Sequence, residues 1–81
     1  MNVIWKSEVF HPMVLGGRAA CIATAYDGSN PHVEIVRQKG GMLVAICCCD
    51  SKEIAVKSAV KISEIDYIDE GVVRKIVKSF S

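Results

Sequence analysis

The first stretch of the chain alternates between apolar and polar side chains. Within residues 2–10, apolar positions are separated by the charged side chains of Lys6 and Glu8. This period of two is typical of a strand with one face buried and one face in water. Pro12 cannot donate to a strand ladder, so we expect the strand to end before it.

Two further strands are predicted in the middle of the chain. Val33 and Ile35 alternate with polar residues after the turn-forming sequence of residues 27–31. Residues 42–49 are apolar at every position, which is typical of a strand covered on both faces. We therefore expect residues 42–49 to form the central strand of a sheet.

Residues 18–26 are ambiguous between helix and strand. Four of these nine residues are alanine, and Gly28 follows at the place of a C-terminal cap. Helix propensity therefore favours a helix. The odd positions would also form a stripe of small side chains on a strand, so the strand remains an open alternative.

Two helices are predicted in the second half of the chain. Asp50 followed by Glu53 has the spacing of a capping pair, which indicates a helix from there to about Val60. Residues 72–80 place apolar side chains on one face and basic ones on the other, as an amphipathic helix does. A short strand is expected between them, within residues 62–67, although Ile62, Ile65, Ile68 and Val72 would also suit a helical stripe.

The predicted element order is strand, helix, strand, strand, helix, strand, helix. This is the split βαβ arrangement with an added terminal helix, an α+β fold in which helices cover one face of a four-stranded antiparallel sheet. We expect one domain that spans residues 1–81. The other sheet face would be bare, and Val44 and Ile46 are expected to present apolar side chains there for a partner.

Composition narrows the classes of function. Hydrophobic residues make up 51% of the chain, and its net charge is +1. A nearly neutral chain has no long-range field to attract nucleic acid or an anionic membrane, so neither is an expected partner. Because residues 1–8 do not resemble a secretory signal, we expect the protein to be cytoplasmic.

The cysteines have a packing interpretation and a chemical one. Consecutive cysteines are geometrically poor disulfide partners for one another, so Cys47, Cys48 and Cys49 are expected to be reduced, as is Cys21. Buried cysteines acting as small apolar side chains are favoured, and we expect neither a metal nor another cofactor. The alternative hypothesis is a thiol or metal-binding protein that uses Cys47, Cys49 and Cys21.

Other polar candidates are few. Gly16, Gly17 and Arg18 precede the possible helix and would cradle an anion through free amides and a guanidinium, although a plain turn is favoured. His11 and His32 each lie beside a proline outside any motif and are interpreted as surface residues. Because the sequence shows no set of residues suited to acid–base catalysis, we expect that the protein is not an enzyme.

The sequence Leu-Gly-Gly-Arg-Ala-Ala at residues 15–20 resembles the active-site turn of the phosphocarrier protein HPr family. The predicted element order also fits that family, although ferredoxin-like domains share the same βαββαβ core. In the HPr family the turn reads Leu-His-Ala-Arg-Pro-Ala, and the histidine carries a phosphate. Here Gly16 occupies the histidine position and Ala19 the proline position, so the resemblance implies a relative that has lost phosphotransfer. It also implies that Arg18 and a regulatory serine, Ser51, mark the surface that a partner contacts.

The function predicted from the sequence is a non-enzymatic protein-binding or regulatory module. Its partner is expected to be another protein or a second copy of itself. The candidate binding residues are Gly16, Gly17, Arg18, Val44, Ile46 and Ser51.

Overall fold

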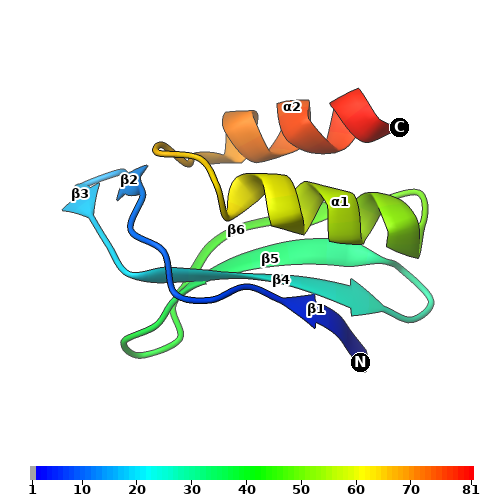
Figure 1. The fold of residues 1–81 in the computed structure, drawn as a ribbon, viewed down its shortest axis with the longest axis horizontal. Helices are drawn as coiled ribbons and strands as arrows, with labels where there is room; N and C mark the ends of the chain where they lie inside the picture. The colour runs from blue at the N-terminus through cyan, green and yellow to red at the C-terminus, as the bar shows by residue number, and fades with distance from the viewer. Residues whose placement is uncertain (1) are drawn as a thin grey trace.

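The fold is a four-stranded antiparallel sheet with two helices packed on one face (Figure 1). A computed structural model describes residues 2–81. The strands of the sheet, in spatial order, are β1 (Asn2–Lys6), β4 (Cys21–Asp27), β5 (His32–Arg37) and β6 (Leu43–Cys48). The α+β class and the antiparallel four-stranded sheet are therefore confirmed.

Both helices follow the sheet in the sequence and form a single layer over it. Helix α1 (Lys52–Ile62) lies over β4 and β5 and reaches β1, while α2 (Glu70–Phe80) lies over β6 and against α1. The predicted positions of both helices are confirmed. The predicted cap of α1 is off by one residue, because Ser51 rather than Asp50 accepts the hydrogen bond from the first turn, at 3.2 Å from the amide nitrogen of Ile54.

The helix predicted at residues 18–26 is wrong, since this segment contains strand β4. Alternate residues Cys21, Ala23 and Ala25 are fully buried where α1 packs on the sheet. Their small side chains suit a strand beneath a helix, and this packing outweighs the helix propensity of alanine. The predicted βαββαβα order is consequently wrong, because the whole sheet precedes both helices.

Two other predictions about strands are also wrong. Strand β6 is at the edge of the sheet rather than at its centre. Residues 62–67 complete α1 and a turn, and only Tyr67 pairs with another strand, through a single parallel bridge to Met13. The face of β6 that lies opposite the helices is therefore not covered by any element in the described part of the chain.

A small hairpin interrupts the sheet between β1 and β4. Its strands are β2 (Met13–Val14) and β3 (Gly17–Arg18), and Gly16 adopts a φ of 90° at the turn, which favours glycine. The hairpin is attached to the segment that precedes α2. The Met13 amide donates to the Asp66 carbonyl at 2.6 Å, and the Ile68 amide donates to the Met13 carbonyl at 2.9 Å.

The hydrophobic core fills the space between the sheet and the helices. Its largest fully buried aliphatic side chains are Val33, Ile35, Ile62, Ile68 and Val73. Each such side chain stabilises the fold by about 1.5–3 kcal/mol relative to exposure in water. The side chains on the helix side of the sheet are thus buried in this core, whereas those on the opposite face are not part of it.

Both outer strands of the sheet are irregular. The register shifts in β1 between Val3 and Trp5, and it shifts again where Ile35 and Val36 pair with β6. Irregularities of this kind twist an edge strand and discourage it from pairing with a strand of another molecule. Neither helix in residues 2–81 has the length and apolar character needed to span a membrane.

Candidate protein-binding surface

Neither helix packs on the sheet face opposite α1 and α2 (Figure 1). Tyr26, His32 and Cys48 are successive cross-strand partners on β4, β5 and β6, and they alternate with the buried residues of the helix side. We call this surface the open face. By register it comprises Val3, Lys6, Ile22, Thr24, Tyr26, His32, Glu34, Val36, Leu43, Ile46 and Cys48.

Apolar side chains are exposed on the open face. The exposed fraction is 47% for Ile46 and 48% for Leu43, both on β6, and 54% for Val3 on β1. Ile46 is therefore placed where the sequence predicted it. Val44 is not, because it is half-buried and packs against the core, next to the register shift in β6.

A stacked aromatic pair lies on the same face. The rings of Tyr26 and His32 have centroids 4.8 Å apart and planes inclined by 12°. His32 Nδ1 is 3.0 Å from the Asn30 carbonyl oxygen, and its Nε2 is 3.6 Å from Glu34 Oε2. Burial, followed by the hydrogen bond and the charge of Glu34, raises the pKa of the Tyr26 hydroxyl.

This cluster shows that the prediction of a surface role for His32 is wrong. The imidazole is buried under Tyr26, with partners near both ring nitrogens, whereas His11 is exposed as predicted. Tyr26 and Glu34 were not predicted as members of this cluster. The alternation of polar and apolar residues through β4 and β5 would have placed both on one face if residues 21–27 had been interpreted as a strand.

The cysteines do not form one cluster. Cys21 is on β4 and Cys47 on β6, with β5 between them, and their partners on β5 are Arg37 and Val33. Cys21 and Cys47 are separated by two strand spacings of about 4.8 Å each, and their partners on β5 are four residues apart along that strand. These two thiols are therefore too far apart to bind one ion. Among residues 2–81, no group of three or more metal-ligating side chains gathers.

The individual thiols differ in burial. Burial raises the pKa of Cys21 and Cys47, and it raises the pKa of Cys49 to about 11, so these three remain protonated near neutral pH. Cys48 is the exposed one. It lines a hollow of about 260 Å³ together with Ile46, His32 and the turn formed by residues 28–30.

Gly16, Gly17 and Arg18 lie in a tight hairpin, in line with the favoured interpretation of this sequence as a plain turn. Gly16 is in the hairpin turn and Gly17 begins β3, so neither starts a helix, and Arg18 Nη1 donates to the His11 carbonyl oxygen at 2.6 Å. Ser51 is the cap of α1, at the other end of the molecule from the hairpin (Figure 1). The helix that the HPr resemblance implies after Arg18 is absent, since residues 21–27 form a strand.

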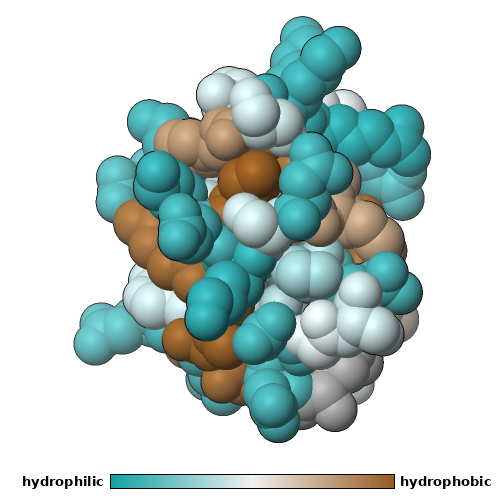
Figure 2. Space-filling model, turned by 90° about the vertical axis from the view of Figure 1, so that its right-hand side faces the viewer, coloured by the Kyte–Doolittle hydropathy of each residue, from teal (hydrophilic) through white to brown (hydrophobic). Residues whose placement is uncertain are grey.

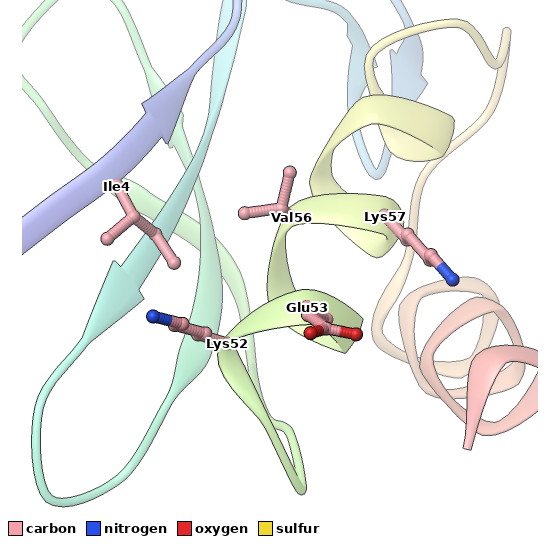
Figure 3. Close-up of a pocket in the computed structure, with 5 residues that line it drawn as sticks. All are labelled: Ile4, Lys52, Glu53, Val56 and Lys57. Atoms are coloured by element: carbon pink, nitrogen blue, oxygen red, sulfur yellow. The ribbon is translucent and has the colours of Figure 1, made fainter.

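A second surface feature lies between β1 and α1. Figure 3 shows Ile4 and Val56 facing one another across this groove, with Lys52 reaching in from the start of the helix. The groove has a volume of about 470 Å³ and is also lined by Glu53 and Lys57. It was not predicted from the sequence, because it depends on how α1 is placed beside an edge strand.

Comparison with known proteins does not place the chain in a family. No protein-family model, curated protein or solved structure matches it.

Proposed function

We propose that this protein is a non-enzymatic protein-binding module that associates with a second copy of itself through the open face. The observation that carries the proposal is the exposure of Leu43, Ile46 and Val3 on a sheet face that neither helix covers. Leu43 and Ile46 lie on the edge strand β6, and Val3 lies on the opposite edge strand β1, so exposed apolar side chains occur at both sides of this face. An exposed apolar surface on a small protein is a candidate interaction surface. Packing two such faces together would remove these side chains from water.

The edges of the sheet support contact through the face rather than strand addition. Both outer strands carry a register shift, and α2 lies over β6. These are features that disfavour a new strand at an edge. Two sheets stacked about 10 Å apart, as in a sandwich, would need no new backbone hydrogen bonds.

The charges on the open face also favour a second copy. Lys6 and Glu34 both flank Thr24 by register, on β1 and β5 respectively. In a two-fold arrangement each surface meets an identical one, so a lysine of one copy can lie against a glutamate of the other. The surface therefore contains the opposite charges that a symmetric contact requires.

Light scattering after gel filtration tests the proposal directly. The wild-type protein should form open-face dimers whose fraction grows with concentration, and Ile46→Asp should abolish this two-fold dimer. Lys75→Gln is a matched control, because it changes the net charge by the same amount on the exposed outer surface of α2. A wild-type protein that stays monomeric at millimolar concentration, or a dimer unaffected by Ile46→Asp, would contradict the proposal.

A further inference from the structure

The tip of the β2–β3 hairpin projects an apolar side chain into solvent. Leu15 is 91% exposed, which is the highest value among the exposed large hydrophobic residues of the described chain. Met13 and Tyr67, which pair through the parallel bridge, are also exposed beside it. Together Leu15, Met13 and Tyr67 form an apolar knob.

The knob is held in place by backbone hydrogen bonds. Besides its attachment at Asp66 and Ile68, the hairpin is closed by the Ala19 amide, which donates to the Pro12 carbonyl at 3.3 Å. Arg18 adds its bond to the His11 carbonyl. A leucine presented on an anchored turn has little conformational freedom left to lose on binding, which favours a role in recognition.

The groove between β1 and α1 is at the opposite end of the molecule. The hairpin is at the left end in Figure 1, whereas Ile4 in β1 and the start of α1 are at the right end. Figure 2 looks at the right end and shows apolar patches between hydrophilic side chains. The apolar floor of Ile4 and Val56, within a volume of about 470 Å³, is large enough for a leucine side chain.

The charges around the two features are opposite in sign. Asp66 and Asp69 flank the Tyr67 side of the knob, and the only cation in the hairpin, Arg18, is bonded to a carbonyl. The groove is lined by Lys52 and Lys57, against the single carboxylate of Glu53. The knob of one molecule and the groove of another are thus complementary in both apolar character and charge.

We propose that the Leu15 knob of one copy docks into the Ile4–Val56 groove of the next. This contact joins two different surfaces, so it is heterologous and gives chains or rings rather than a closed dimer. It goes beyond the open-face contact and does not depend on it. Open-face dimers linked through their hairpins would form larger assemblies.

Analytical ultracentrifugation of Ile46→Asp isolates this contact, because that substitution blocks the open face. The mean mass should still rise with concentration, without a plateau at the dimer. Adding Leu15→Ser should weaken the association by roughly tenfold or more, which is the change expected from losing one buried leucine side chain. Lys52→Glu, an exposed change that leaves the core intact, should weaken it as well.

A mixing experiment tests the heterologous geometry. In the Ile46→Asp background, a chain with Leu15→Ser keeps its groove, and a chain with Val56→Asp keeps its knob. Each should be monomeric alone, and a mixture should form a pair of one chain of each kind. Circular dichroism would show whether Val56→Asp is folded. If it is not, Lys52→Glu takes its place as the groove variant.

The outcomes separate this proposal from the open-face dimer. A mass of Ile46→Asp that does not rise with concentration would overturn the knob-and-groove contact, even if the wild-type protein dimerises. Association unchanged by Leu15→Ser would also overturn it, as would variants that do not complement one another on mixing. If the open-face dimer is not observed but Ile46→Asp still associates, only the proposed function is contradicted.

Discussion

The aromatic ring of Tyr26 on β4 stacks on the imidazole of His32 on β5, with centroids 4.8 Å apart. This pair covers part of a sheet face on which no helix packs, and it buries a histidine there. It is therefore a local core on the open face, and it can be tested independently of any association.

Replacing Tyr26 by leucine should lower the stability of the fold. Stacked aromatic pairs contribute about 0.5–1.5 kcal/mol beyond the area they bury. Chemical denaturation of Tyr26→Leu, His32→Leu and the double variant would give the coupling energy between the two rings. Tyr67→Leu is the control, because Tyr67 is exposed, and it should change the stability little. A coupling energy near zero would show that the stacking is not stabilising.

Replacing Ser58 by alanine should stabilise the protein. Ser58 is fully buried in α1, and its hydroxyl has no hydrogen-bond partner among the described residues. Removing an unsatisfied buried hydroxyl from a helix should raise the free energy of unfolding by about 0.5–1.5 kcal/mol. Alanine has no polar group to desolvate, and it has a higher helix propensity than serine. Thermal denaturation would measure the change against Ser79→Ala, whose exposed hydroxyl donates to the Ile76 carbonyl. A lower melting temperature for Ser58→Ala would contradict this prediction.

Ser51 and Asp69 should each contribute to stability as helix caps. Their side chains accept hydrogen bonds from the amides of Ile54 and Val72, at 3.2 and 2.8 Å. Substitution of either cap by alanine should cost about 1 kcal/mol in urea denaturation. Asp50→Ala provides the comparison, since the sequence pattern predicts Asp50 as the cap and the structure shows Ser51. An equal loss from Asp50→Ala would mean that the cap has been misassigned.

The stability of the protein should fall between pH 9 and pH 11 in part because of Cys49. Burial raises the pKa of this thiol from 9.0 to about 11. Above pH 9 the unfolded chain loses the proton first, so unfolding becomes more favourable until the folded thiol also ionises. Urea denaturation at several pH values should show a smaller decline for Cys49→Ala than for the wild type, while Ser79→Ala, which removes no ionisable group, should keep the full decline. Identical pH profiles for the wild type and Cys49→Ala would exclude this contribution.

The parts of the fold that follow local rules were predictable from the sequence. Helix α2 is amphipathic and begins after a capping aspartate, and β5 alternates between the apolar Val33 and Ile35, which are fully buried, and polar residues on its other face. These signals act over a few residues. Local structure could therefore be predicted without knowing which segments meet.

The errors concern choices that depend on distant segments. In residues 21–27, alanine favours a helix locally, but pairing with β1 and β5 and burial under α1 favour a strand. The apolar run of β6 does not reveal that only one of its faces is covered. Ile46 was placed correctly, whereas Val44 was not, since a register shift beside it could not be seen in the alternation.

The small side chains of Cys21, Ala23 and Ala25 beneath α1 have a consequence for how this protein can evolve. Most substitutions at these positions would add volume to fully buried sites beneath α1. Sequence variation there should therefore be rare. On the opposite side of β4, Ile22 and Tyr26 are only half-buried, so changes there meet less resistance. A lineage could thus retain its backbone while exchanging one binding specificity for another.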